Sequence, residues 1–388
     1  MISFDNTEIA FQSKSDKDLK RAYWLFRIIG SPKVVSFGKW ATNLALKLHL
    51  PIRRPVKATI FKQFCGGESI EDCKTAIDQL GKFHVGTILD YSVEGKTSDD
   101  DFDRTVEVII QTILRAKNDP QIPFAVFKVT GIGRFDTIEL AASGKQLNEK
   151  EKQDVAIIHS RIDRIAKAAF DNKVPLFIDA EETWIQDAID TWCWEMMLRY
   201  NRERAIVYNT LQMYRHDRLE FLQKMLTQSK EAGVFYGIKL VRGAYMEKER
   251  ERAAQKGYPS PIQPDKAATD RDYDAALEVI TKNNDVFALC AGTHNELSSE
   301  KLTLLLAENQ IEKEDERFYF AQLLGMSDHI SYNLSYAGYR VAKYVPFGPV
   351  REVMPYLLRR ADENTSVAGQ TGRELSLIQK ELKRRAGK

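Results

Sequence analysis

Eight short runs of apolar and β-branched residues recur along the chain, and each is followed by a longer segment in which apolar residues return every three or four positions. This alternation is typical of parallel strands joined by helices. The runs are Gly86–Ser92, Ala125–Thr130, Pro175–Glu181, Ala205–Gln212, Gly237–Gly243, Val286–Thr293, Arg317–Leu324 and Val341–Gly348. Eight strands that close within about 270 residues predict an α/β fold, a distorted (β/α)8 TIM barrel, in preference to an open doubly wound sheet.

A glycine fingerprint for dinucleotide binding is missing from this pattern. The nearest match, Gly131-Ile132-Gly133, lacks the third glycine. A fold that binds a dinucleotide through a glycine-rich first turn is therefore disfavoured.

Helical patterns flank the barrel on both sides. We expect an N-terminal helical arm over residues 1–84, with helices from Leu19 to Leu50 and from Glu68 to Gly81, then a barrel domain over 85–368 and a basic C-terminal helix over 369–388. In that last helix Leu375, Ile378 and Leu382 form a stripe beside several lysines and arginines. The stripe suits either contact with an anionic bilayer or packing against the protein.

Charge and cysteine content exclude several classes of protein. Fifty-seven basic and 55 acidic residues leave a net charge of +2, too small for a nucleic-acid-binding chain. Four cysteines without a C-x-x-C pair indicate neither a disulfide scaffold nor a zinc site, and no metal is expected. The N-terminus resembles neither a secretory signal nor a transit peptide, and no stretch reaches the roughly 18 apolar residues of a membrane span. We expect a cytoplasmic protein, with peripheral contact at the inner membrane as an option.

Polar residues gather late in the strand-like runs. Parallel strands often end in polar residues because they reach solvent there, but in a barrel the carboxyl ends of the strands also carry the chemistry. Taken together, the following residues favour a polar site: Asp90, Lys128, Asp179, Gln212, Arg242, Tyr245, Thr293, His294, Asn295 and Tyr344.

Several of these positions have a plain structural interpretation as well. Lys128 can turn outward or bind a carboxylate, and Asp179 is either an acidic strand end or an acid–base group. The Thr293-His294-Asn295 triplet suits a capped turn entering a helix, or a donor to a phosphate or flavin carbonyl.

A last helix follows the eighth run over Pro349–Thr365, with Pro349 suited to its first turn. Arg359, Arg360 and Glu363 share one face of it. Such a triplet is commonly a solvated salt-bridge cluster. Near a barrel mouth, two adjacent guanidinium groups also suit bidentate capture of a small carboxylate.

Five ordered motifs resemble the proline dehydrogenase (proline oxidase) family, in its monofunctional, eukaryotic-type branch. They are KLVRGAY (Lys239–Tyr245), GTHNE (Gly292–Glu296), QLLGM (Gln322–Met326), KYVPFGPV (Lys343–Val350) and YLLRRADEN (Tyr356–Asn364), supported by LDYSVEG, FKVTGIGRF and DAEETW. The resemblance implies noncovalent FAD at the mouth of a distorted barrel. It also implies oxidation of L-proline to 1-pyrroline-5-carboxylate by hydride transfer from C5 to flavin N5, the first step of proline degradation to glutamate. Electrons would pass to a quinone, and a separate aldehyde dehydrogenase would act on the product.

The same resemblance implies roles for individual residues. Arg359, Arg360 and Lys128 would clamp the proline carboxylate, Tyr344 would pack on the substrate ring with Leu323 and Tyr245 lining the pocket, and Asp179 would hold this cage by hydrogen bonding. Cofactor contacts are implied for Asn209, Gln212, Lys239, Val241, Arg242, Gly243, Thr293, His294, Asn295 and Glu363. One departure is Lys239, where many bifunctional bacterial members carry arginine.

Three alternatives stay open at this level. Hydroxyproline dehydrogenases of the same family tend to carry serine where this chain has Tyr344, so the tyrosine favours proline. A methylenetetrahydrofolate reductase would have no need for adjacent arginines on the last helix. A catalytically inactive barrel is disfavoured because every residue of the implied cage is present.

Overall fold

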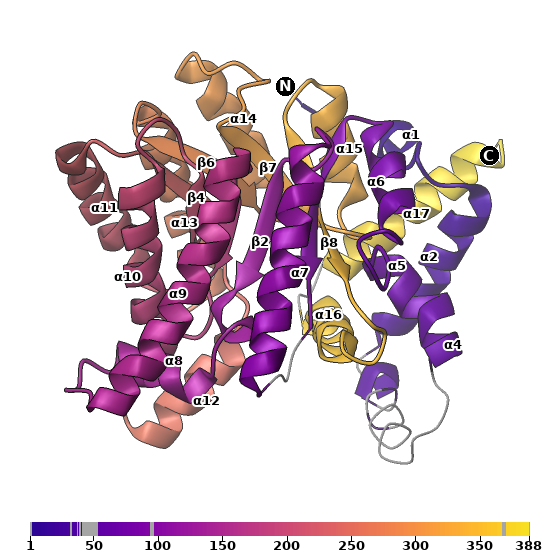
Figure 1. Cartoon of the computed structure of the whole chain (residues 1–388). Helices are drawn as coiled ribbons and strands as arrows, with labels where there is room; N and C mark the ends of the chain where they lie inside the picture. The colour runs from indigo at the N-terminus through magenta and orange to yellow at the C-terminus, as the bar shows by residue number, and fades with distance from the viewer. Residues whose placement is uncertain are drawn as a thin grey trace. The chain divides into compact units, whose positions relative to one another are not determined.

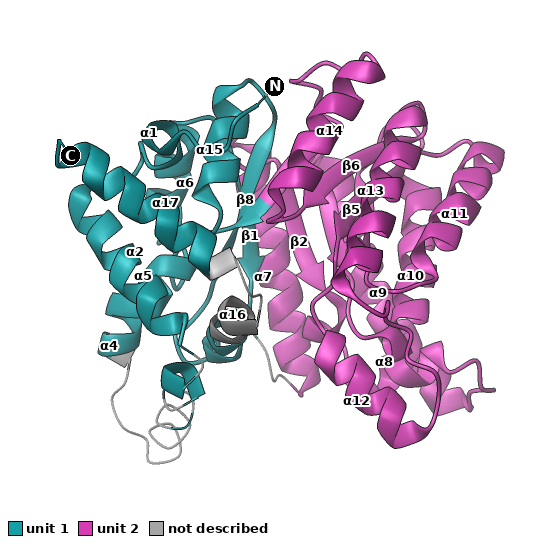
Figure 2. Cartoon of the chain, turned by 180° about the vertical axis from the view of Figure 1, so that it is seen from behind, with its two compact units in different colours: residues 1–95, 322–388 teal, residues 96–321 magenta. Residues whose placement is uncertain are grey.

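The computed structural model describes residues 2–31, 33–36, 38, 40, 53–93, 97–366 and 370–387, with the backbone alone at residues 53, 361–366, 370 and 371. Figure 2 shows the two compact units into which the chain divides: unit 1 is Met1–Gly95 with Gln322–Lys388, and unit 2 is Lys96–Ala321. The boundaries of these units differ from those of the three expected regions. The helices before the first strand and after the last strand belong to unit 1 together with those two strands.

Eight parallel strands follow one another in the order of a closed barrel, which confirms the predicted α/β barrel. Each strand lies within two residues of the bounds expected from the sequence, and Figure 1 labels most of them. The strands are β1 (Val85–Tyr91), β2 (Phe124–Lys128), β3 (Leu176–Asp179), β4 (Val207–Gln212), β5 (Tyr236–Val241), β6 (Phe287–Gly292), β7 (Phe318–Leu323) and β8 (Val341–Phe347). Every residue of β4 and β8 is buried, as expected for parallel strands covered on both faces.

Helices in unit 2 return the chain from one strand to the next. They are α7 (Asp99–Lys117), α8 (Phe135–Ala142), α9 (Glu149–Asn172), α10 (Thr183–Tyr200), α11 (Arg218–Ala232), α12 (Met246–Lys256), α13 (Lys266–Lys282) and α14 (Glu296–Glu308). Local signals set their ends. Asn148 and Glu151 form a capping box at the start of α9, and Gly233 ends α11 in the left-handed region.

Unit 1 packs its helices around an apolar cluster that includes Phe26, Phe64, Leu357 and Ile378. The helices are α1 (Thr7–Ala10), α2 (Asp16–Ile29), α4 (Arg53–Val56), a π-helical turn (Lys57–Phe61), α5 (Lys62–Phe64), α6 (Lys74–Gly81), α15 (Asp328–Tyr336), α16 (Met354–Ser366) and α17 (Gln370–Arg385). None of the helices in the described ranges is long and apolar enough to cross a membrane.

Two predicted helix starts are wrong. The helix expected from Glu68 begins only at Lys74, because Gly67 pairs with Phe347 and the N–H of Glu68 donates to the Asp72 carboxylate in a turn. The last barrel helix begins at Met354 and not at Pro349. A start at Pro349 would place Pro355 in the helix interior, where proline removes a hydrogen bond; in α16 it lies in the first turn.

The terminal segments resolve one alternative. Helix α2 matches the first part of the predicted arm, while residues 41–52 lie outside the described part of the chain. In α17, Ile378 is 1% exposed, and Leu375 and Leu382 pack against the unit 1 cluster. Of the two interpretations of this stripe, packing against the protein is the one found.

Aromatic side chains form the floor of the barrel interior in unit 2. The Phe124 and Phe177 rings stack with centroids 4.3 Å apart, and Tyr319 meets Phe124 edge-on at 4.8 Å. Tyr208 lies against both phenylalanines. Because side chains two or four positions further along a strand share its face, this layer supports the polar residues at the carboxyl ends of the same strands.

Candidate active site

Asp179, the last residue of β3, joins two lysines at the carboxyl ends of the strands. Its Oδ2 lies 3.0 Å from Lys128 Nζ, and its Oδ1 lies 2.5 Å from Lys239 Nζ. Lys128 stands opposite it on β2, whereas Lys239 reaches across from β5. Each carboxylate oxygen therefore serves one ammonium group, and the three side chains form a fixed cation–anion–cation row.

Burial sets the electrostatics of this row. The side chains of Asp179 and Lys239 are each 9% exposed, whereas that of Lys128 is 30% exposed. Burial alone would raise the pKa of Asp179, but the charges of Lys239 and Lys128 outweigh it and hold the pKa below its ordinary value. Lys239 Nζ also lies 5.9 Å from the centroid of the Phe177 ring beneath it. The row thus carries a net positive charge over an aromatic floor.

Glu181 fixes the segment that follows Lys128. Its carboxylate, just past β3, accepts hydrogen bonds from the backbone N–H of Thr130 at 3.0 Å and from the Thr130 hydroxyl. Burial raises the pKa of Glu181 to about 7, although both bonds from Thr130 oppose that rise. The sequence marked Glu181 only as part of an acidic strand end, and its partner lies 51 residues earlier in the chain.

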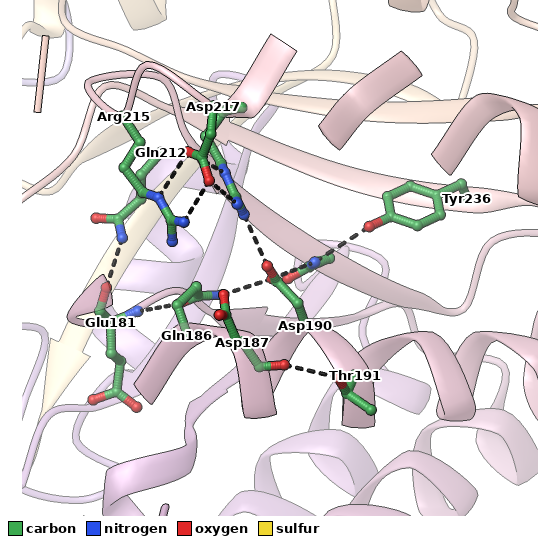
Figure 3. Close-up of polar contacts among 11 residues, drawn as sticks. Glu181, Gln186, Asp187, Asp190, Thr191, Gln212, Arg215, Asp217 and Tyr236 are labelled. Carbon is green, nitrogen blue, oxygen red and sulfur yellow. Dashed lines mark hydrogen bonds and ion pairs between the residues drawn. The ribbon is translucent and has the colours of Figure 1, made fainter. Parts of the chain in front are cut away.

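Gln212 ends β4 in a buried amide network that Figure 3 shows. Its Nε2 donates to the backbone carbonyl of Glu181 at 2.7 Å, so a ligand in the barrel would meet the amide oxygen, Oε1. The N–H of Glu181 in turn donates to Gln186 Oε1 at 2.8 Å. Gln186 lies on α10, so these bonds connect the Gln212 side chain to that helix and fix its orientation.

Asn209 lies apart from the other expected cofactor residues. It faces the helices, since its Nδ2 donates to Asp190 on α10 at 2.9 Å and to the Tyr236 hydroxyl at 3.2 Å. Arg218 binds the other oxygen of Asp190 at 2.8 Å. Side chains alternate along a strand, so Asn209 and the inward-facing Gln212 point to opposite sides of β4. The structure does not bring Asn209 together with Lys239 and Asp179.

A second polar group forms where β5 and β6 end. Arg242 donates to the Thr293 hydroxyl at 2.7 Å and pairs with Asp270 at 2.6 Å. Thr293 also accepts from the N–H of Asn295, and Asn295 caps α14 by accepting from Ser298. His294 is half-buried between them. A guanidinium, a histidine and a helix N-terminus together make a setting that suits an anion such as a diphosphate.

Gly243 and Tyr245 continue this edge. Gly243 has a φ of +135°, and a Cβ on it would lie 2.5 Å from the Tyr214 ring, so only glycine fits. Val241 and Tyr245 on either side are half-buried. A ligand could therefore approach the backbone closely at this position.

Leu323, Tyr344, Arg359 and Arg360 belong to unit 1. Tyr344 is 7% exposed in β8, and its carbonyl accepts from the N–H of Leu324 at 2.8 Å, next to the half-buried Leu323. Arg359 and Arg360 follow one another in α16, both half-buried, with the Arg360 guanidinium 5.3 Å from the Tyr356 ring centroid. Glu363 lies in the same helix, and its side chain is outside the described part.

A buried charge cluster supports this part of unit 1, and the sequence did not reveal it. Lys343, beside Tyr344, has its Nζ 2.8 Å from Asp328 and donates to the carbonyls of Met326 at 2.7 Å and Leu323 at 3.3 Å. Lys14 approaches the other Asp328 oxygen at 3.3 Å. An ionisable residue within an otherwise apolar strand was the only signal for it in the sequence.

Comparisons with known proteins identify the family of this chain. The family model for proline dehydrogenase matches residues 73–373. A protein of Dictyostelium discoideum named proline dehydrogenase 1, mitochondrial, is 31% identical over 98% of this chain and 74% of its own length. The hydroxyproline dehydrogenase of Xenopus laevis is 30% identical over 99% of this chain and 90% of its own.

Solved structures share the fold. Proline utilization A of Bdellovibrio bacteriovorus superposes with a TM-score of 0.74 at 20% identity, over 95% of this chain and 40% of that one. This chain therefore spans less than half the length of that longer protein. The family model and the Dictyostelium protein both match most of the sequence, and the chain belongs to the proline dehydrogenase family.

Proposed function

We propose that this enzyme is an FAD-dependent dehydrogenase that oxidises L-proline to 1-pyrroline-5-carboxylate by hydride transfer from C5 to flavin N5. The observation that carries the proposal is the Lys128, Asp179 and Lys239 row at the carboxyl ends of β2, β3 and β5. It offers one partly exposed cation for a substrate carboxylate and one buried cation for the negative charge that a flavin ring would gain on reduction. A flavin ring and an amino acid together need both.

The donor set of unit 2 fits FAD. Lys239, Val241 and the Gln212 amide oxygen would meet the isoalloxazine ring, while Arg242, His294 and the start of α14 suit its diphosphate. Gly243 leaves the backbone open to the same ligand. Thr293 accepts a hydrogen bond from Arg242 and Asn295 caps α14, so both would contribute to cofactor binding indirectly. Glu363 and Asn209 are assigned by resemblance alone. When bound, FAD would supply the hydride acceptor that no side chain provides.

From the resemblance alone, we assign the substrate carboxylate to Lys128 of unit 2 and to Arg359 and Arg360 of unit 1. Guanidinium groups bind carboxylates bidentately, and Lys128 is held in place by Asp179. Tyr344, Leu323 and Tyr245 would pack on the apolar ring. The role of this set is to orient C5 of the substrate, because a fixed approach supplies much of the rate enhancement in such a transfer.

An anaerobic titration with L-proline tests the proposal. The purified protein should show a flavin absorbance band at about 450 nm that bleaches when L-proline is added. A band that stays oxidised would contradict proline as the substrate, and a protein that binds no flavin after reconstitution would contradict FAD.

Tyr344 should set the preference for proline over trans-4-hydroxy-L-proline. By resemblance, the Tyr344 ring, which is 7% exposed in β8, would pack on the substrate ring, where an added 4-hydroxyl group would meet it. Tyr344→Ser should shift the ratio of the two kcat/KM values toward hydroxyproline by about 10-fold or more. The matched control, Tyr336→Ser, removes a tyrosine that is 73% exposed and should leave the ratio unchanged. Equal efficiency of the unmodified enzyme on both substrates would contradict the assignment.

Electron transfer to a quinone, a separate aldehyde dehydrogenase for the product and a cytoplasmic site with peripheral contact at the inner membrane complete the proposal. A soluble quinone analogue should reoxidise the reduced flavin faster than oxygen does. Reoxidation that is no faster with the quinone would contradict this acceptor.

A further inference from the structure

Helix α2 presents two different faces. Leu19, Ala22, Phe26 and Ile29 are buried in the apolar cluster of unit 1. On the opposite face, Trp24 is 57% exposed and Ile28 is 50% exposed. Large apolar side chains scattered singly on a surface are ordinary, but these two lie four positions apart on one helix and therefore adjoin.

Basic residues surround this apolar pair. Lys17, Lys20, Trp24 and Arg27 lie three or four positions apart, so they share the exposed face with Ile28. The Arg27 guanidinium lies 5.3 Å from the Trp24 ring centroid, and Tyr23 meets that ring edge-on at 5.6 Å. The indole is therefore held in its outward position by its neighbours.

The acidic residues of α2 are committed to partners beside this face. Asp18 pairs with Arg21 at 3.0 Å and accepts from Ser15, and Asp16 pairs with Arg385 of α17 at 2.8 Å. Helices α2 and α17 lie side by side (Figures 1 and 2). Lys17, Lys20 and Arg27 thus give the exposed face a positive charge.

We propose that this face of α2, comprising Lys17, Lys20, Trp24, Arg27 and Ile28, binds an anionic lipid bilayer. A tryptophan and an aliphatic residue surrounded by lysine and arginine match the composition of helices that lie in the membrane interface. Each basic side chain gains about 1 kcal/mol near an anionic surface, and Trp24 and Ile28 would insert at headgroup depth. Two apolar side chains on a convex helix are too few for a stable protein interface, which buries about 800 Å² per partner.

This inference places bilayer contact on α2, because the apolar stripe of α17 is buried in the protein. The purpose of this bilayer contact rests on the proposed quinone acceptor, since membrane quinones lie in the bilayer. Lipid binding itself is measured without substrate, and proline oxidation with a soluble acceptor is measured separately. Failure of the two proposals can therefore be told apart.

Vesicle flotation with the full chain tests the proposal. The unmodified protein should float with vesicles of phosphatidylcholine and phosphatidylglycerol, and much less with phosphatidylcholine alone. Trp24→Ala/Ile28→Ala should weaken binding to the mixed vesicles by about 10-fold or more, and Lys17→Gln/Lys20→Gln by a similar factor. The control, Leu297→Ala/Leu304→Ala, removes two leucines of α14 that are 74% and 46% exposed, and it should bind as the unmodified protein does.

Several results would overturn the proposal. These are no binding to the mixed vesicles, equal binding to both vesicle types, and equal loss in the α14 control. A dimer in sedimentation velocity that Trp24→Ala/Ile28→Ala dissociates, without any lipid binding, would assign the face to a second copy of the chain. All α2 variants should retain proline oxidation with a soluble acceptor, which shows that they are folded.

Discussion

Replacing Asp179 with asparagine is expected to lower kcat/KM for L-proline by about 100-fold, or ~2.7 kcal/mol of transition-state stabilisation. Asparagine keeps the shape of the side chain but removes the charge that separates Lys128 from Lys239. The two ammonium groups then repel each other, and removing one member of a buried ion pair is costly because the remaining charge loses its partner. Steady-state kinetics at several proline concentrations give the size of the effect.

Glu182→Gln is the matched control for this substitution. Glu182 lies three residues after Asp179, is also buried, and pairs with Lys248, whose side chain is 58% exposed. It lies outside the lysine row, so we expect less than about a threefold change in kcat/KM. If Asp179→Asn retained full activity, or lost activity only because it unfolded, the role given to the row would be wrong. Circular dichroism and flavin content distinguish loss of function from loss of fold.

The strands could be predicted because their signal is local. Each apolar run is bounded by polar or turn residues. The parallel sheet buries both faces of β4 and β8, so the buried residues coincide with the apolar run in the sequence. The cap at Asn295 was also predictable, since its hydrogen bond spans only three residues. The strand bounds and this cap, which depend on nearest neighbours in the chain, were confirmed.

One helix start was wrong because a distant segment decides it, and strand register decides where the side chains of a motif lie. The helix expected from Glu68 is displaced by pairing between Gly67 and Phe347, residues that lie far apart in the sequence. Motif matching selects Asn209 and Gln212 together, but the pleat of β4 turns one toward Asp190 and the other toward the barrel interior. A motif identifies residue types and spacing, while the side on which each residue lies depends on strand register.

The Lys343 cluster shows the same limit. Its charges come from the N-terminal arm, α15 and β8, and Glu374 of α17 accepts from the N–H of Ser327 beside it. No spacing rule links positions so far apart. Lys14 of the N-terminal arm and Lys343 of β8 share the Asp328 carboxylate of α15, so this ion cluster links the arm to the last strand within unit 1.

Lys343→Met should lower the free energy of unfolding by about 3–5 kcal/mol at neutral pH. The side chain of Lys343 is 1% exposed and that of Asp328 is 8% exposed, so the substitution leaves a buried carboxylate whose remaining ion partner among the described residues is Lys14. Lys14→Met is the milder comparison, because that lysine is 22% exposed, and it should cost about 1 kcal/mol or less. Urea unfolding followed by circular dichroism measures both.

The pH dependence and a double substitution separate lost charge from lost packing. Burial would raise the pKa of Asp328, but Lys14 and Lys343 lower it to about 2. A lowered pKa stabilises the fold above the ordinary carboxyl value of about 3.8, and this contribution is lost as pH falls toward 2. Without Lys343 the pKa of Asp328 rises, so the deficit of Lys343→Met should shrink on acidification. Lys343→Met/Asp328→Asn should be more stable at neutral pH than Lys343→Met alone, because the unpaired charge is gone. A double variant no more stable than the single one, with a deficit that is constant with pH, would mean that Lys343 contributes packing and not charge.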